Sequence, residues 1–453
     1  MKMMLSEIAE KIKGKHNGQD VAVASVSIDT RALQPGDLYL AIKGHQFDGN
    51  DFVGKAEQAG AIAAIVNAGV NTSLPHISVT DTRIALGNLA SAWRDKVPSK
   101  IVGVTGSNGK TTVKEMTAAI LSQDDEVLYT KGNLNNDIGV PLTLLRLNEK
   151  HKYAVIEMGA NHLGEIAYTG AIAKPDVVIL NNAGGAHIEG FGSLDGIAKG
   201  KGEIIEVLKP EGTAVLNKDD KYFDYWKSIA GNRKVITFGF NESADVSAHE
   251  VQMKVDGSGF ATTFNLVIDD TYLPVKLNVA GQHNVKNALA ATAAALALGM
   301  GLEKIKAGLE SLKPVTGRMQ PLVGRLGNIV IDDTYNANAD SLKAGVDVLM
   351  NCPGSHWVVL GAFGELGPNS PKIHEEIGEL ISFKGVVRLL AIGSDAKNTV
   401  RAFGKGAVFF ESQDELINTL NSELTGSETI LVKGSRSQRM ENVVAALVDN
   451  FRM

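Results

Sequence analysis

One glycine-rich run constrains this 453-residue chain more than any other segment: residues 103–112 read GVTGSNGKTT. The run follows an apolar segment and precedes a helical pattern, which predicts a strand, a phosphate-binding loop and a helix in that order. Glycines let backbone N–H groups face phosphate oxygens, and a helix N-terminus adds partial positive charge. The run therefore predicts a site for a nucleoside triphosphate.

Two side chains of the run complete the chemistry of this site. Lys110 can reach the terminal phosphates, and the Thr111 hydroxyl can ligate Mg²⁺. The chain departs from the general pattern at Val104, where glycine is usual, and has glycines at 103 and 106 instead. The residues expected to bind the nucleotide are Gly106, Ser107, Asn108, Gly109, Lys110, Thr111 and Thr112.

The composition excludes several classes of protein. A net charge of −6 argues against nucleic-acid binding, because a surface that follows phosphates normally has a basic excess. Cys352 is the only cysteine, which leaves no disulfide and suits a reducing cytosol. Residues 1–18 lack the apolar core of a signal peptide, and the apolar run 288–300 is too short to cross a bilayer. We expect a soluble, cytoplasmic monomer without membrane insertion.

The order of strand and helix patterns predicts an α/β protein of three domains, as the length also suggests at roughly 150 residues per domain. Residues 1–82 carry short strand patterns between turn signals and predict a small N-terminal α/β domain. Residues 83–313 predict a central P-loop ATPase-like domain with a mostly parallel sheet. A second alternating series in residues 314–453 predicts a C-terminal Rossmann-like domain.

Three residues near predicted strand ends are candidates for chemistry, because ligands of doubly wound sheets lie beyond the carboxyl ends of the strands. Glu157 follows the apolar strand 153–156, where a carboxylate can hold Mg²⁺ or form a plain salt bridge. His187 lies on a glycine-rich strand exit and could bind a metal or phosphate, or be structural. Lys201 lies in a charged run at the predicted start of a helix, where solvated charges are the ordinary alternative.

Taken together, these motifs resemble the Mur ligase family of peptidoglycan synthesis. That family uses ATP to join amino acids or peptides to a nucleotide-linked muramoyl precursor. The likeness spans the whole chain and rests, besides the phosphate loop, on residues 157–159, 181–187, 280–288, 317–318, 332–338 and 431–437. The resemblance implies an ATP-dependent amide ligase that acts in cell-wall biogenesis, cell shape and cell division.

Within the family, the closest likeness is to the member that adds D-alanyl-D-alanine to UDP-N-acetylmuramoyl-tripeptide. The segments that favour it are 131–139, 333–338, and 361–367 followed by 433–436. The sister ligase that adds a diamino acid is expected to carry an Asp-Asn-Pro-Arg motif in its last domain, and this chain has none. The chain has Ala362 where the family usually has an aspartate.

The resemblance implies cofactors and ligands for the central residues. Lys110 would contact the β- and γ-phosphates of ATP, Thr111 and Glu157 would bind Mg²⁺, and His187 would bind a second Mg²⁺. Lys201 matches the lysine that family members carbamylate, which converts a cation into an anionic oxygen ligand for the second ion. Lys110, His187 and Lys201 are therefore the expected catalytic residues.

The resemblance also implies contacts with the rest of the nucleotide and the substrates. Asn287 would meet adenine, while Arg318 and Asp333 would reach phosphate and ribose from the domain junction. In residues 1–82, taken as the domain that binds the UDP-muramoyl peptide, Ser27 and Arg31 offer donors for a diphosphate or simply cap a turn. Residues 83–313 would bind ATP and 314–453 the incoming dipeptide. The remaining substrate positions are Asn133, Asn135, Asn136, Tyr335, Asn336 and Asn338.

The mechanism implied is acyl phosphate formation, with the third domain closing over the cleft. Two alternatives remain open from the sequence. One is another ATP-dependent amide ligase, either the diamino-acid sister or a folate polyglutamylating enzyme, and the segment 27–31 argues against the folate enzyme. The other is a non-catalytic nucleotide switch, which would not need Glu157, His187 and Lys201 as a second metal site.

Overall fold

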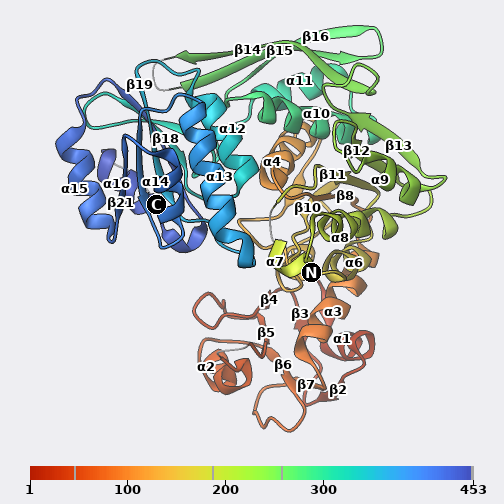
Figure 1. The fold of residues 1–453 in the computed structure, drawn as a ribbon. Coiled ribbons are helices and arrows are strands. Elements are labelled where there is room, and N and C mark those ends of the chain that lie inside the picture. Colours follow the sequence, from red (N-terminus) through yellow and green to blue (C-terminus); the bar gives the residue numbers. More distant parts are fainter. Residues whose placement is uncertain (45–46, 186–187, 257–258, 450–453) are drawn as a thin grey trace.

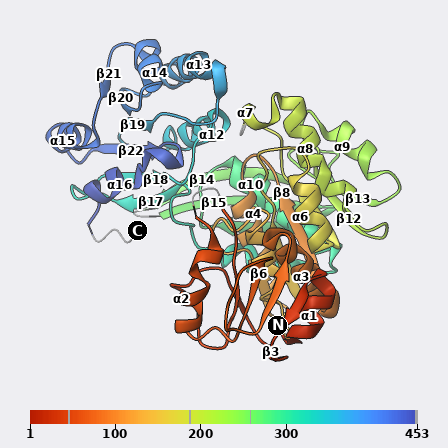
Figure 2. The same ribbon diagram turned by 90° about the horizontal axis from the view of Figure 1, so that it is seen from below.

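The computed structural model describes residues 1–44, 47–185, 188–256 and 259–449. Their strands gather into three main sheets that follow one another along the chain (Figure 1). Seen from below, the N-terminal and C-terminal segments lie on different sides of the central elements (Figure 2). The predicted α/β fold with a large, mostly parallel central sheet is confirmed.

The N-terminal sheet has five short strands in the order β2-β7-β6-β5-β4. All neighbours are parallel except β2 and β7, and the buried apolar faces of β5 and β6 form its core. A separate antiparallel pair joins β1 (Met3–Met4) to β3 (Ala22–Val23). The other elements are α1 (Leu5–Ile12), β2 (Lys15–Asn17), β4 (Val26–Ser27), β5 (Leu38–Leu40), α2 (Val53–Gln58), β6 (Ala63–Asn67) and β7 (His76–Val79).

The central sheet has nine strands in the order β16-β15-β14-β13-β12-β11-β8-β10-β9. From β14 to β9 the neighbours are parallel, whereas β14, β15 and β16 form an antiparallel meander that the sequence interpretation missed. The strands are β8 (Lys100–Thr105), β9 (Val127–Tyr129), β10 (Tyr153–Glu157), β11 (Val177–Leu180), β12 (Thr213–Asn217), β13 (Lys234–Phe238), β14 (Val246–Asp256), β15 (Gly259–Ile268) and β16 (Thr271–Leu277).

Helices cover both faces of the parallel part of this sheet. Ile101 belongs to the core under α3, α5, α6 and α8, while its neighbour Val102 belongs to the core under α4, α10 and α11. Strands buried on both faces read as continuous apolar runs, which is why they were visible in the sequence. The helices are α3 (Thr82–Lys96), α4 (Lys110–Leu121), α5 (Gly139–Leu144), α6 (Glu165–Ala173), α7 (Ile188–Phe191), α8 (Leu194–Glu206), α9 (Phe223–Ala230), α10 (Gln282–Ala297) and α11 (Leu302–Glu310).

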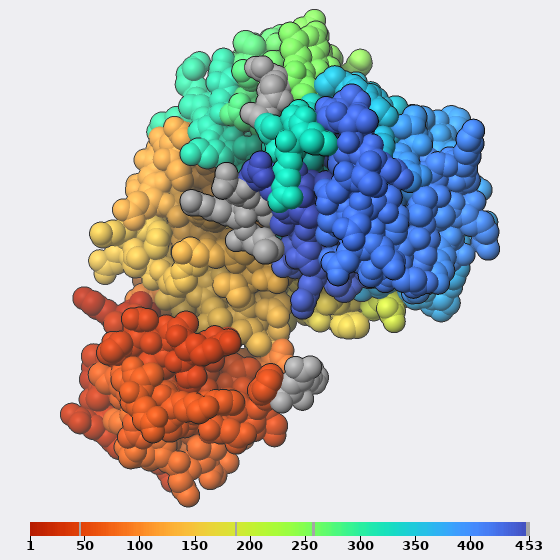
Figure 3. All heavy atoms as spheres, turned by 90° about the vertical axis from the view of Figure 1, so that its left-hand side faces the viewer, coloured from red at the N-terminus to blue at the C-terminus, as the bar shows by residue number. Residues whose placement is uncertain are grey.

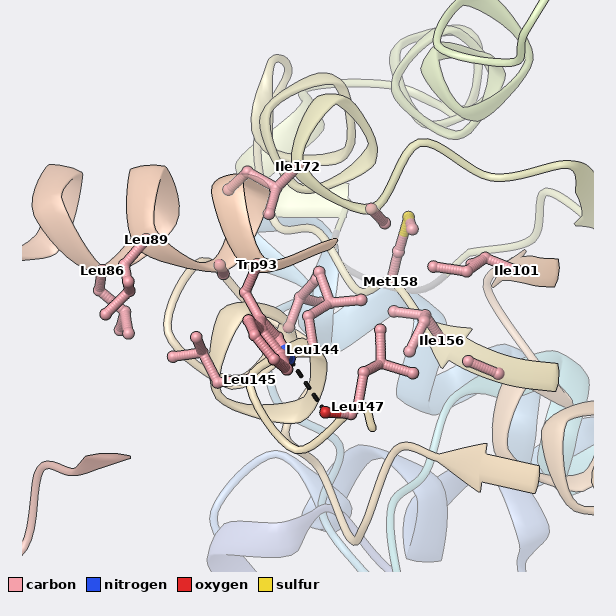
Figure 4. Close-up of a cluster of buried hydrophobic side chains, with 14 of the residues drawn as sticks. Leu86, Leu89, Trp93, Ile101, Leu144, Leu145, Leu147, Ile156, Met158 and Ile172 are labelled. Carbon is pink, nitrogen blue, oxygen red and sulfur yellow. Dashed lines mark hydrogen bonds between the residues drawn. The ribbon is translucent and has the colours of Figure 1, made fainter. Parts of the chain in front are cut away.

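Helix α3 anchors the N-terminal sheet to the central one. Figure 4 shows Trp93 of this helix beside Leu144, Leu145 and Leu147 at the end of α5 and just after it, with Leu86 and Leu89 further along the same helix. The Trp93 indole N–H donates to the carbonyl of Leu147 at 2.9 Å, so its polar atom is satisfied inside the cluster. Truncation of a buried tryptophan to alanine typically lowers the free energy of unfolding by about 3–5 kcal/mol.

The C-terminal sheet has six strands in the order β17-β18-β22-β19-β20-β21, with only β17 antiparallel. The alternating strands and helices predicted for this region are present, so the Rossmann-like pattern is confirmed. The strands are β17 (Gln320–Val323), β18 (Ile329–Asp333), β19 (Ser355–Gly361), β20 (Arg388–Ile392), β21 (Ala407–Phe410) and β22 (Glu428–Lys433). The helices are α12 (Ala339–Leu349), α13 (Ser370–Phe383), α14 (Ala396–Phe403), α15 (Gln413–Glu423) and α16 (Glu441–Leu447).

The space-filling view shows how these parts meet. The N-terminal residues form a lobe that projects away from the rest, whereas the C-terminal residues lie against the central elements (Figure 3). Within the described residues, no helix combines the length and the apolar character needed to cross a membrane.

Candidate active site

The phosphate-binding loop connects the buried strand β8 to the first turn of α4, as the sequence predicts. Gly109 has a φ of +79° and precedes the helix. A Cβ there would lie 2.4 Å from the Asn287 side-chain oxygen and 2.6 Å from the Asn181 side-chain nitrogen. Glycine is therefore required at this position both by backbone conformation and by space.

Two asparagines that follow β11 hold the loop in shape. Asn182 accepts a hydrogen bond from the backbone N–H of Asn108 at 2.8 Å and donates to its carbonyl at 3.0 Å. Asn181 donates to the same carbonyl and to Asn287 on α10, both at 2.9 Å. The sequence interpretation singled out this strand exit but gave these two residues no role. Their position directly after an apolar strand was the available signal.

Thr111 and Glu157 lie together at the buried end of the loop. The Thr111 hydroxyl donates to the Glu157 carboxylate at 2.9 Å, and Asn135 donates to its other oxygen at 2.8 Å. Glu157 is 2% exposed, because it closes β10 next to β8. The strand-end carboxylate and the loop hydroxyl are thus brought together as expected.

Lys110 folds back over the loop. Its ammonium group donates to the Gly106 carbonyl at 2.8 Å. Burial lowers its pKa, and the nearby positive charge of Arg318 lowers it further, whereas Glu157 acts in the opposite direction. The cation is thus held at the loop, where a phosphate group would be bound.

Lys201 is a fully buried lysine in the middle of α8, not at the start of a helix as predicted. The helix begins earlier because Ser193 caps it and accepts a hydrogen bond from the N–H of Gly196. The Lys201 amine contacts the Ala160 carbonyl at 3.3 Å and lies 5.4 Å from the centre of the Phe191 ring. Burial, with a smaller contribution from the charge of Lys110, lowers its pKa to about 7.

Residues from the C-terminal segment reach the phosphate loop directly. The Arg318 guanidinium stacks on the Tyr335 ring at 4.0 Å and donates to the Thr111 hydroxyl at 2.8 Å. Asn338, the N-cap of α12, donates to the Asn108 side chain at 2.7 Å. The predicted junction between the central and C-terminal segments is thus made of direct hydrogen bonds to the phosphate loop.

Asp333 forms a buried ion pair with Lys433. The two residues end the neighbouring strands β18 and β22, and their charged groups are 2.5 Å apart. The Lys433 ammonium also donates to the Asn336 carbonyl at 3.0 Å. Lys433 occurs in a family-like motif but had no role in the sequence interpretation, because its partner is far away in the sequence.

A cavity of about 1270 Å³ lies between these elements. It receives residues from the phosphate loop, from the ends of β10, β11, β18 and β22, and from α10 and α12. The predicted residues that line it are Ser107, Asn108, Gly109, Lys110, Thr111, Thr112, Asn135, Asn136, Glu157, Asn287, Arg318, Asp333, Tyr335, Asn336 and Asn338.

Several predicted residues are not part of this cavity lining. Gly106 belongs to the loop and accepts a hydrogen bond from Lys110, Lys201 is buried in α8, and Asn133 lies in the asparagine-rich segment before α5. In the N-terminal sheet, the Ser27 hydroxyl bonds the Asp29 carbonyl at 3.1 Å and Arg31 pairs with the Asp29 carboxylate at 2.7 Å. Ser27 and Arg31 therefore share Asp29 as their partner. His187 lies outside the described residues.

The fold defines a phosphate-loop protein with a cavity between a central, mostly parallel sheet and a Rossmann-like one. Three family descriptions match along the chain. They are "Mur ligase family, catalytic domain" over residues 22–95, "Mur ligase middle domain" over 104–295 and "Mur ligase, glutamate ligase domain" over 317–436. The chain belongs to the Mur ligase family.

Relatives match over the full length. The UDP-N-acetylmuramoyl-tripeptide--D-alanyl-D-alanine ligase of Escherichia coli K12 is 44% identical over 449 residues, 98% of each chain. The protein of the same name in Bacillus subtilis is 33% identical over 99% of each. Among solved structures, MurF from Acinetobacter baumannii has a TM-score of 0.92 at 36% identity over 98% of each chain. MurF ligase from Thermotoga maritima in complex with ADP has a TM-score of 0.82 at 28% identity, covering 94% and 97%.

Proposed function

We propose that the chain is an ATP-dependent ligase that joins D-alanyl-D-alanine to UDP-N-acetylmuramoyl-tripeptide and forms the pentapeptide precursor of peptidoglycan. Full-length relatives carry this name, and one related ligase has been solved with ADP. The observation that carries the proposal is the contact of Arg318 with Thr111, because it joins the C-terminal segment to the phosphate loop, where the phosphate end of the nucleotide would be enclosed. The reaction serves cell-wall synthesis, and with it cell shape and division, in the cytoplasm.

Thr111 and Glu157 fit a Mg²⁺ ion. Their oxygens lie 2.9 Å apart in a buried corner of the cavity, and Mg²⁺ prefers hard hydroxyl and carboxylate oxygens. Mg²⁺ usually takes one or two protein ligands and completes its shell with phosphate and water. This agrees with the finding that no group of three or more His, Cys, Asp and Glu within the described ranges could hold a metal. The ion would neutralise charge on the transferred phosphoryl group.

Lys201 is the residue we assign to a carbamate that, with His187, would hold a second Mg²⁺. Burial lowers the pKa of its amine to about 7, so a large share is neutral at neutral pH. The neutral nitrogen can attack the carbon of CO₂ to form an N–C bond, and its proton leaves to water. The product is an anionic oxygen donor, which an ammonium group cannot be. A ¹³C NMR signal that appears with ¹³C-bicarbonate and is missing in Lys201→Ala would support this assignment.

The chemistry proceeds in two substitutions. The tripeptide carboxylate attacks the γ-phosphorus of ATP, ADP leaves, and an acyl phosphate forms. The dipeptide amine then attacks the carbonyl carbon, phosphate leaves, and the amine proton passes to solvent. Lys110 and Arg318 place positive charge where the phosphoryl group transfers, so the chain acts by positioning and electrostatics without a protein nucleophile.

The substrate contacts complete the proposal. Asn287 would contact adenine and Asp333 the ribose, while Ser27 and Arg31 would hold the uridine diphosphate. The other substrate residues we propose are Asn133, Asn136, Tyr335, Asn336 and Asn338. We divide the chain into residues 1–82 for the muramoyl peptide, 83–313 for ATP and 314–453 for the dipeptide, and expect one chain to act alone.

The test is phosphate release from ATP and Mg²⁺ with UDP-muramoyl-tripeptide as first substrate. We expect release to depend on added D-alanyl-D-alanine. A parallel assay pairs the UDP-muramoyl-dipeptide with diaminopimelate or lysine, and release only there would move the chain to the sister ligase. Release in neither assay, with ADP still bound, would refute the catalytic proposal in favour of a nucleotide switch.

A further inference from the structure

Lys433 is a buried lysine at the edge of the nucleotide cavity to which the mechanism above gives no task. Lys433 is the last residue of β22, and its side chain is 2% exposed. A buried cation is costly unless it is paired and hydrogen-bonded, and Lys433 meets this demand through Asp333 at 2.5 Å and the Asn336 carbonyl at 3.0 Å. The pair therefore fixes the direction of the Asp333 carboxylate.

The second oxygen of Asp333 holds a strained backbone. Oδ1 accepts a hydrogen bond from the N–H of Met319 at 3.2 Å, while Oδ2 is taken by Lys433. Met319 has a φ of +50°, a left-handed conformation that side chains with a Cβ avoid. Such a conformation persists where the surroundings determine it, and the Asp333 carboxylate is the polar group that does so here.

The conformation of Met319 decides where Arg318 points. Arg318 is the preceding residue, and its guanidinium stacks on Tyr335 at 4.0 Å and donates to Thr111 at 2.8 Å. Tyr335 is itself fixed, because its N–H donates to the Gly317 carbonyl at 3.0 Å. A continuous series of contacts thus runs from Lys433 through Asp333 and Met319 to the arginine at the phosphate loop.

We propose that Lys433 is a positioning residue for phosphoryl transfer. It orients Asp333 so that Met319 keeps its left-handed turn and Arg318 stays aimed at Thr111. This inference rests on the proposed ligase function, since Arg318 is there the group that meets the transferring phosphate. A direct contact of Asp333 with ribose would act on nucleotide affinity, whereas the series through Arg318 acts on the rate of the chemical step.

The test is a double-mutant cycle in the full chain with Lys433→Met and Arg318→Ala, followed by phosphate release. We expect Lys433→Met to lower kcat by about a hundredfold, the typical cost of displacing a catalytic group by an ångström. In the Arg318→Ala background the same change should lower kcat less than about twofold, because its target is gone. An equal loss in both backgrounds, or a loss confined to the KM for ATP, would overturn the proposal.

Two further variants guard against a folding defect. Lys397→Met removes a lysine of α14 that pairs with Glu411 at 3.0 Å on the surface, and it should leave kcat unchanged. Lys433→Arg keeps the charge, so kcat should recover to within about tenfold of the wild type. No recovery with a folded Lys433→Arg chain would count against the ion pair as the cause.

The affinity for ADP with Mg²⁺, measured by calorimetry on the same four chains of the cycle, separates this inference from the ligase function. If the wild type binds ADP but shows no D-alanyl-D-alanine-dependent release, the function fails. The proposed role in phosphoryl transfer then fails with the function, whereas a wild type that turns over while Lys433→Met leaves kcat unchanged overturns the positioning series alone.

Discussion

Gly109→Ala tests the phosphate loop at its tightest point. Alanine at a φ of +79° costs about 1–2 kcal/mol, because its Cβ crowds the backbone in the left-handed region. The new Cβ would also lie 2.4 Å from the Asn287 oxygen, which forms the buried hydrogen bond with Asn181. Leaving that pair unmade costs about 1–3 kcal/mol, so the whole loss is about 2–5 kcal/mol.

Gly299→Ala is the matched control, since it separates backbone strain from steric displacement. Gly299 has a φ of +82° and follows α10, the helix that carries Asn287, but a Cβ there would have nothing within 4 Å. It should therefore lose only the conformational part, about 1–2 kcal/mol. The difference in the free energy of unfolding between the two variants measures the cost of displacing Asn287 and Asn181.

The assay is urea unfolding followed by tryptophan fluorescence in a Trp357→Phe background. The remaining tryptophans, Trp93 and Trp226, lie in the core cluster that includes the central sheet and so report on it. Calorimetry with ADP and Mg²⁺ runs in parallel. Equal destabilisation by Gly109→Ala and Gly299→Ala, with ADP binding preserved in both, would refute the steric argument.

Three further predictions concern ionisation, metal binding and packing. In CO₂-free buffer, the stability of the wild type relative to Lys201→Met should fall as the pH drops from 10.5 to 7 and then level off. Burial lowers the pKa of Lys201 to about 7 in the folded chain, so over this range the unfolded chain binds the proton first. A difference in urea titrations that does not change with pH would contradict this. Glu157→Gln should raise the Mg²⁺ concentration needed for half-maximal phosphate release by at least about tenfold, while circular dichroism shows that the fold is retained. An unchanged Mg²⁺ titration would remove Glu157 from the metal site. Trp93→Phe should cost about 1–3 kcal/mol in urea unfolding, since the Leu147 carbonyl loses its buried donor, and a loss below that range would mean that water replaces the indole.

The sequence predicted those parts of the site that depend on local order. The loop at 103–112 and the carboxylate of Glu157 each follow an apolar strand, and parallel strands deliver their carboxyl ends to one edge. Strand pairing then brings Thr111 to within 2.9 Å of that carboxylate. Knowledge of periodicity and of sheet type was sufficient for this part of the cavity.

The remainder depends on packing between segments that are distant along the chain. Lys201 was compatible with a solvated charge run, and its burial arises because Gly200 lets the Phe191 ring approach α8, where a Cβ would come within 2.4 Å. The pairing of Lys433 with Asp333 spans 100 residues and requires that β22 lies beside β18. No periodic pattern in the sequence carries that neighbour relation.

Two helix N-termini meet at the cavity, and this explains why both sheets are needed. α4 begins at Lys110 in the phosphate loop, and α12 begins after Asn338, which bonds Asn108 in the same loop. Each N-terminus contributes partial positive charge, whose effect fades within the first turn. The γ-phosphoryl group of ATP already carries negative charge, which is spread over its equatorial oxygens during transfer, so we expect its stabilisation to use both helix ends together with Arg318. A chain in which the C-terminal sheet is displaced from the loop should therefore keep nucleotide affinity through the loop while losing turnover.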